Sequence, residues 1–174
     1  MGFKNIKDHF NIDDHTVAIT EKGISIGAGY IKHLVDINVT TGEVVENPTF
    51  RGFLKDKYPL LAAATPEEIL RLINSSDMFE VSLPAYTFNG SEIIEKQCEA
   101  FGYPNVTHDG EQMYNNTFFE DKEQAIEKAI CEAEMGVEYY NDSIDRLLAE
   151  IEVAKKDLEV SQNDLTKLKE MEIN

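Results

Sequence analysis

The amino-acid sequence predicts an α+β protein, in which an antiparallel β-meander with two short helices precedes a long C-terminal helix that forms a coiled coil. Two observations carry this prediction. Residues 16–47 are rich in β-branched residues that alternate with polar ones, which is typical of strands with one buried face. From residue 121 onward, apolar residues recur in alternating steps of four and three with no proline between them. We therefore expect a globular domain at 1–120 and a helix at 121–174.

The first third of the chain predicts the meander. Residues 1–15 are polar and fit either a short helix or an arm. The run Thr16–Thr20 is β-branched and ends at a Glu-Lys-Gly turn. Residues 30–39 have a strand-like composition, and 35–39 alternate between apolar and polar. A tight turn at Thr41-Gly42 leads into a returning strand at 43–46. Three or four antiparallel strands are expected.

The middle of the chain predicts two short helices and one strand. Thr65-Pro66-Glu67-Glu68 has the cap, the proline and the acidic residue of a helix start. Residues 79–83 alternate as a strand before Pro84, with Tyr86 and Phe88 as a possible extension. Asn89-Gly90-Ser91 is expected to cap a second helix at 92–101, and a long polar loop follows at 103–119.

The long helix has a continuous apolar seam. With Ile130 at heptad position a, β-branched residues dominate a and leucines share d, which favours a parallel pair of helices. In that pair Glu150 would face Lys155, and Asp164 would face Lys169. The residues expected to oligomerise lie late in this seam: Ile144, Leu147, Ile151, Ala154, Leu158, Leu165 and Leu168.

The two halves of the helix differ in sequence. Before Arg146 a second apolar stripe, formed by Cys131, Met135 and Tyr139, predicts that 121–145 is docked on the domain. From there 146–172 is expected to be the oligomerising coiled coil, with a dimer favoured. Leu148, Val153 and Val160 lie off the seam and also fit three or four helices. The alternatives are a helix that folds back on its own domain, for example as a hairpin that breaks at Asn141–Ser143, and a different partner helix.

Charge is the strongest functional signal in the sequence. The chain has 33 acidic and 16 basic residues, a net charge of −17. This balance disfavours direct binding to nucleic acid or to anionic membranes and favours a basic protein partner. The residues expected to form the acidic partner-binding surface are Glu92, Glu95, Glu99, Asp109, Glu111, Glu132, Glu134, Glu138, Asp142 and Asp145. A solvated, functionless acidic face is the alternative.

Candidate catalytic and cofactor sites are weak. His9, Asp13, Asp14 and His15 lack the spacing of a helical zinc site. The glycines at 23–29 lack the Lys-Ser/Thr pair of a phosphate-binding loop. No catalytic residue, metal or cofactor is therefore expected.

Three further side chains bear on a possible enzyme and on the compartment. Neither Cys98 nor Cys131 has a partner in sequence that would lower its pKa. His108, beside Asp109, marks the 103–119 loop as the place where an enzymatic site would lie. The two cysteines and a start without an apolar run predict a cytoplasmic protein.

The sequence predicts a non-enzymatic, acidic, self-associating protein that engages a basic protein. One form of this hypothesis is an inhibitor that imitates nucleic acid and blocks a nucleic-acid-handling or defence protein, since small, acidic, tryptophan-free chains occur among virus-encoded accessory proteins. A structural or assembly protein that uses the coiled coil as its scaffold is the second hypothesis. A small enzyme with a site in the 103–119 loop is the third.

Overall fold

The structure, a computed structural model, describes residues 1–172. Met1–Glu127 form one compact unit, and the residues from Lys128 onward form a second. The predicted α+β class is confirmed, because a four-stranded antiparallel sheet and several short helices precede one long C-terminal helix. A coiled coil needs a second helix and stays a prediction.

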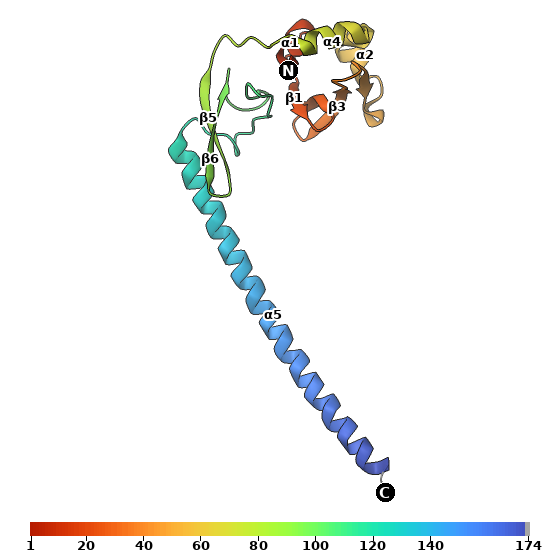
Figure 1. Ribbon diagram of the computed structural model, residues 1–174, viewed down its shortest axis with the longest axis vertical. Coiled ribbons are helices and arrows are strands. Elements are labelled where there is room, and N and C mark those ends of the chain that lie inside the picture. Colours follow the sequence, from red (N-terminus) through yellow and green to blue (C-terminus); the bar gives the residue numbers. More distant parts are fainter. Residues whose placement is uncertain (173–174) are drawn as a thin grey trace. The chain divides into compact units, whose positions relative to one another are not determined.

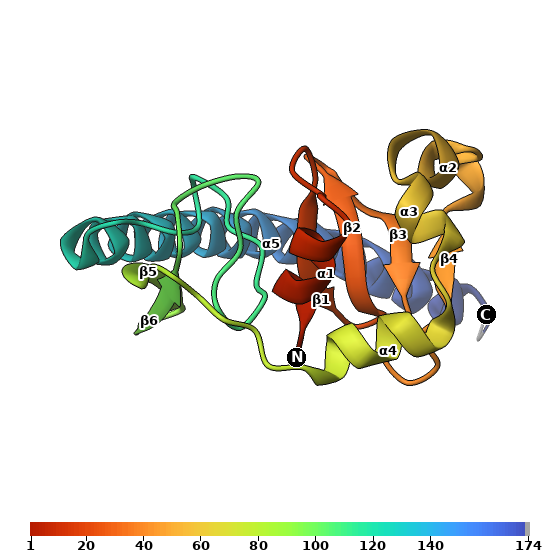
Figure 2. The same ribbon diagram turned by 90° about the horizontal axis from the view of Figure 1, so that it is seen from above.

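The sheet is the predicted meander, with its strands in the order β1-β2-β3-β4. The strands are β1 (Thr16–Thr20), β2 (Gly23–Ala28), β3 (Ile31–Ile37) and β4 (Val44–Glu46), and they lie side by side in Figure 2. Ile24 pairs with Ile37 and Ser25 with Asp36, and a bulge follows Ile26. Since side chains alternate across a strand, the isoleucines and the Ser25–Asp36 pair lie on opposite faces.

Short helices supply the cover for the sheet. They are α1 (Phe3–His9), the 3₁₀ turn η1 (Pro48–Phe50), α2 (Phe53–Lys57), α3 (Pro59–Ala63) and α4 (Pro66–Asn74). The predicted start of α4 is confirmed, because the Thr65 hydroxyl accepts a hydrogen bond from the Glu68 backbone at 3.3 Å. The apolar stretch between residues 53 and 63, whose apolar residues follow no regular period, folds into α2 and α3.

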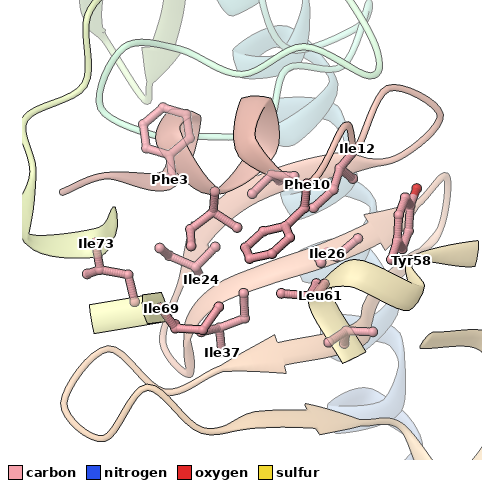
Figure 3. Packing of buried hydrophobic residues seen from close by; sticks show 13 residues of the cluster. Phe3, Phe10, Ile12, Ile24, Ile26, Ile37, Tyr58, Leu61, Ile69 and Ile73 are labelled. Carbon is pink, nitrogen blue, oxygen red and sulfur yellow. The ribbon is translucent and has the colours of Figure 1, made fainter. Parts of the chain in front are cut away.

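The main hydrophobic core lies between one face of the sheet and the helices α1, α3 and α4 (Figure 3). Ile24, Ile26 and Ile37 reach it from the strands, and each is fully buried. Leu61 of α3 and Ile69 of α4 meet them there, at 1 % and 0 % exposure. A core with contributions from every layer explains why this region forms one unit.

The predicted helix at 92–101 is wrong. These residues form β6 (Glu92–Cys98), which pairs in antiparallel fashion with β5 (Leu83–Asn89). Gly90 has a φ of 59° and opens the two-residue turn before Ser91, as glycine does in type II′ hairpins. The expected strand at 79–83 therefore begins later than predicted and runs through Pro84. A small second core gathers on this hairpin around Ala85, Cys98, Met113 and Phe118.

The last element is α5 (Lys122–Glu172), one helix of 51 residues (Figure 1). At 1.5 Å per residue it is roughly 75 Å long. Helical geometry continues through Asn141–Ser143, so the alternative of a hairpin that breaks there is wrong. Ala125 in its first turns is buried within the compact unit.

Candidate functional site

The apolar seam of α5 is uncovered in the single chain. From Ile130 to Leu168 its large apolar residues are between 49 % and 67 % exposed. Ile151, at 49 %, is the least exposed of them and Tyr140, at 67 %, the most. Monomeric proteins rarely expose a continuous apolar surface of this length, so the seam is a candidate interaction surface.

Side-chain ion pairs within α5 add little to the stability of the helix. Ion pairs along the described part of the helix include Lys128–Glu132 at 3.5 Å and Lys155–Glu152 at 2.7 Å. Exposed pairs of this kind contribute about 0.3–0.5 kcal/mol each. Since isolated helices are marginal in water, a helix this long is expected to gain most of its stability from contacts along its seam.

The predicted docking of residues 121–145 stays a prediction. Cys131, Met135 and Tyr139 form the second stripe that suggested it, and all three are exposed in the single chain. They belong to the second unit.

The acidic residues of α5 form an exposed array. Glu132, Glu134, Glu138, Asp142 and Asp145 are all exposed, and no lysine or arginine lies between Lys128 and Arg146. Within the described residues, Glu132 is the only one of the five with an ion pair, which it makes with Lys128. The remaining four carboxylates are available to a partner.

A shallow groove runs along the same part of α5. It is lined by the apolar residues Ile130, Ala133 and Val137, together with Glu134, Glu138, Asn141 and Asp142. An apolar surface flanked by carboxylates suits a partner helix that is apolar on one face and basic beside it.

Three of the predicted surface acids in the globular unit, Glu99, Asp109 and Glu111, are engaged in ion pairs. Lys96 contacts Asp109 at 2.7 Å and also contacts Glu111, while Glu99 contacts Lys4 at 3.0 Å. Partial burial alone would raise the pKa of Glu99, but hydrogen bonds from Lys4 and from the Glu80 backbone outweigh it and lower that pKa. These three acids therefore present less free charge than the array on α5.

Because residues 92–98 form a strand and not a helix, the predicted acidic surface is divided between two faces. On the expected helix Glu92, Glu95 and Glu99 would have shared one face. On a strand, side chains alternate, so Glu92 points to the face opposite that of Glu95. Both are exposed, and Glu95 accepts a weak hydrogen bond from Gln97 at 3.3 Å.

The 103–119 loop is tied down at His108. The His108 ring stacks on Phe79 with centroids 3.8 Å apart, and its backbone donates to the Gln97 carbonyl at 2.7 Å. Its Nε2 atom is buried and has no hydrogen-bond partner among residues 1–172. Asp109 turns away to Lys96 and Thr107. His108 and Asp109 therefore contact different partners.

A small cavity adjoins His108. Its volume is about 60 Å³, and Lys4, Glu99 and Asn105 are among the side chains that line it. Ligand sites usually have volumes of about 300–1,000 Å³. This cavity is large enough for water but too small for a metabolite.

Ser25, His33 and Asp36, whose residue types are common in catalytic sites, lie together on the polar face of the sheet. This cluster was not predicted from the sequence. Asp36 Oδ1 accepts from the Ser25 hydroxyl at 2.7 Å and from His33 Nδ1 at 2.7 Å. Partial burial would raise the pKa of Asp36, but hydrogen bonds from Ser25, His33 and Lys22 outweigh it and lower that pKa. The bulge in β2 and β3 brings these side chains together, and no sequence motif marks a bulge of this kind.

This cluster does not have the geometry of a hydrolase triad. A triad serine gives its proton to one histidine nitrogen while the carboxylate holds the other. Here Ser25 gives its proton to the carboxylate itself and lies 3.2 Å from the same Nδ1 atom. Ser25 is also only 1 % exposed. We conclude that the cluster stabilises the sheet.

The other candidate ligands and thiols go to separate partners. His9 contacts Glu68 at 3.0 Å, whereas His15 Nδ1 contacts the Tyr58 hydroxyl at 2.6 Å. Across residues 1–172 no three histidine, cysteine or acidic side chains converge as metal ligands would. Burial, with a smaller effect from Glu120, raises the pKa of the Cys98 thiol. That shift disfavours the reactive thiolate.

In the described part of the chain, no helix is both long enough and apolar enough to cross a lipid bilayer. Comparison of the sequence and structure with protein-family models, curated proteins and solved structures found no match.

Proposed function

We propose that this chain is a non-enzymatic, acidic, self-associating protein that binds a basic protein partner. The observation that carries the proposal is the array on α5, where Glu134, Glu138, Asp142 and Asp145 are exposed and free of ion pairs within the described residues. Clustered charge of one sign attracts a partner of the opposite sign and speeds its association.

The spacing of the array supports imitation of nucleic acid as one form of this function. Glu134, Glu138 and Asp142 are four residues apart, so their carboxylates are spaced roughly 6 Å along the helix axis. Each DNA strand carries a phosphate about every 3.4 Å along its axis. One helix therefore has about half the linear charge density of a DNA strand, and a pair of helices would approach it.

The test is capture of a basic protein by the full chain and by matched variants. The double change Glu138→Lys and Asp145→Lys alters two residues of the array at heptad position b. The double change Glu152→Lys and Glu159→Lys alters the same heptad position by the same charge, but outside the array. We expect capture of a basic protein from the native host to be lost at high salt and in the first variant, and kept in the second.

Competition separates imitation of nucleic acid from simple charge attraction. A partner that uses its nucleic-acid groove should be displaced by duplex DNA or RNA. Capture that survives both high salt and the change at Glu138 and Asp145 would show that the array is not the binding surface.

The scaffold hypothesis remains the second candidate, because the exposed seam extends well beyond the acidic array. Truncation at Arg146 distinguishes the two hypotheses. If the shortened chain is monomeric but still captures its partner, binding is the function of the array and the seam supplies only assembly. If it loses partner and assembly together, the coiled coil is the functional element.

A further inference from the structure

We infer that the occupant of the α5 seam is a second copy of this chain, parallel and in register, over residues 144–168. The inference rests on the self-association in the proposed function and adds its orientation, register and position. Its first basis is exposure: Ile144, Ile151, Leu158 and Leu165 at position a are each between 49 % and 56 % exposed. A seam of this kind reaches normal burial only against another helix.

The charges beside the seam select the orientation. At position g the chain has Glu150, Asp157 and Asp164, which are all acidic. At position e it has Lys155 and Lys169, with the neutral Gln162 between them. The side chains of Lys155 and Glu150 are not tied to each other in the single chain, since Lys155 contacts Glu152.

A parallel pair brings position g of one helix beside position e of the next heptad on the other. Glu150 then meets Lys155, Asp164 meets Lys169, and Asp157 meets Gln162, so that no like charges face each other. In an antiparallel pair g meets g and e meets e. The three acids would then face acids and the lysines would face lysines, which is unfavourable.

The shape of the seam agrees with a pair. Ile144 and Ile151 are β-branched at a, and Leu147 and Leu168 lie at d, the distribution that favours two parallel strands. Ala154 and Ser161 at d are small, so two identical side chains fit there across the axis. A parallel pair also places the two acidic arrays at the same end, which would make the protein bivalent toward a basic partner.

Single cysteines introduced into the full chain test the inference. In a Cys131→Ser background, Ala154→Cys and Ser161→Cys each put a thiol at position d, where a parallel, in-register pair brings two copies together. Ala149→Cys is the matched control, because Ala149 lies at position f on the opposite side of the helix. Mild oxidation with a glutathione buffer should link most of the chains in both d variants and few in the control.

Other outcomes overturn the inference. An antiparallel pair can bring only one of the two d positions beside its own copy, so linkage at one position alone would contradict the parallel arrangement. A mass of one or three chains by sedimentation would contradict the pair, and circular dichroism will show whether each variant retains its helix.

The proposed function can fail separately. Linkage at both d positions, together with unchanged capture by the Glu138→Lys, Asp145→Lys variant, would leave the pair intact and remove the role of the acidic array. Absence of linkage, together with salt-sensitive capture by the array, would do the reverse.

Discussion

Replacement of Asp36 tests whether the Ser25–His33–Asp36 cluster stabilises the sheet. Asp36→Asn keeps the size of the side chain and one acceptor for Ser25, but it removes the charge that His33 and Lys22 face. Hydrogen bonds to charged groups contribute about 1.5–3 kcal/mol each, whereas exposed ion pairs contribute at most about 1 kcal/mol. Lys22 is 54 % exposed, so it adds little. We expect Asp36→Asn to lower the free energy of unfolding by about 1–2 kcal/mol at neutral pH.

The pH dependence of this loss follows from the sign of the pKa shift. The pKa of Asp36 is lower in the folded protein, so the folded state favours its charged form. The stabilisation is therefore present above the unfolded pKa of the carboxyl group and is lost as the pH falls through the folded pKa. In acid the native carboxyl group is protonated and resembles the amide, so the difference between the variant and the native chain should approach zero.

Urea unfolding followed by circular dichroism, at neutral pH and in acid, measures both quantities. Asp56→Asn is the control, because it removes the same charge from an exposed side chain of α2 and should change stability by only a few tenths of a kcal/mol. If Asp36→Asn costs the same at both pH values, or costs no more than the control, the carboxylate does not stabilise the sheet.

Two further predictions concern backbone freedom and tyrosine ionisation. Gly110 has a φ of +85°, and a Cβ there would lie 2.5 Å from Ile19 Cγ1, so Gly110→Ala should cost about 1–3 kcal/mol in urea unfolding. Gly136 lies inside α5 with open space around it, so Gly136→Ala should instead stabilise the helix by up to about 1 kcal/mol. Equal effects of the two substitutions on stability would contradict this reasoning. Burial raises the pKa of Tyr58 to about 12, with smaller effects from Asp14 and Asp13. The protonated phenol therefore stabilises the folded state fully below the pKa of tyrosine in the unfolded chain, and this stabilisation is lost as the pH rises through the folded pKa. Phenolate absorbance should show one late-titrating tyrosine that disappears in Tyr58→Phe.

Elements with strong local signals could be predicted from the sequence. The cap at Thr65 and the proline after it determine where α4 begins, and both act within one turn of the helix. The unbroken heptad phase likewise predicted that α5 would pass Asn141 without a break. Each of these features depends on neighbours in sequence, which is why the sequence was enough.

The β5–β6 hairpin shows where local signals become ambiguous. Asn89-Gly90-Ser91 has the residues of a helix cap and also those of a two-residue hairpin turn. Long-range contacts favour the hairpin: Tyr86 forms a bridge with Phe119, and Cys98 is buried in the second core. Tertiary contacts commonly override helix propensity in this way.

The candidate site was predicted in part for the same reason. Exposed acids on α5 follow from helix periodicity alone, whereas the fate of Glu99 depends on Lys4, a residue 95 positions away in sequence. The meeting of Ser25, His33 and Asp36 depends on strand register and a bulge. Sequence periodicity therefore predicts surfaces on regular helices better than polar clusters that tertiary contacts assemble.

The two proposals for α5 oppose each other electrostatically, and this gives them opposite salt dependence. In a parallel pair the five acids between Glu132 and Asp145 of one chain would lie at the same end as the same five of the other, at heptad positions b, c, e and f outside the apolar seam. Two like charges about 20 Å apart in water repel by roughly 0.2 kcal/mol before screening, each acid faces five on the other chain, and salt at physiological strength screens over about 8 Å. The attractive pairs at Lys155 and Lys169 are too few to cancel this repulsion. Added salt should therefore strengthen pairing of the chain while it weakens capture of a basic partner, and a basic partner bound across both arrays should itself stabilise the pair.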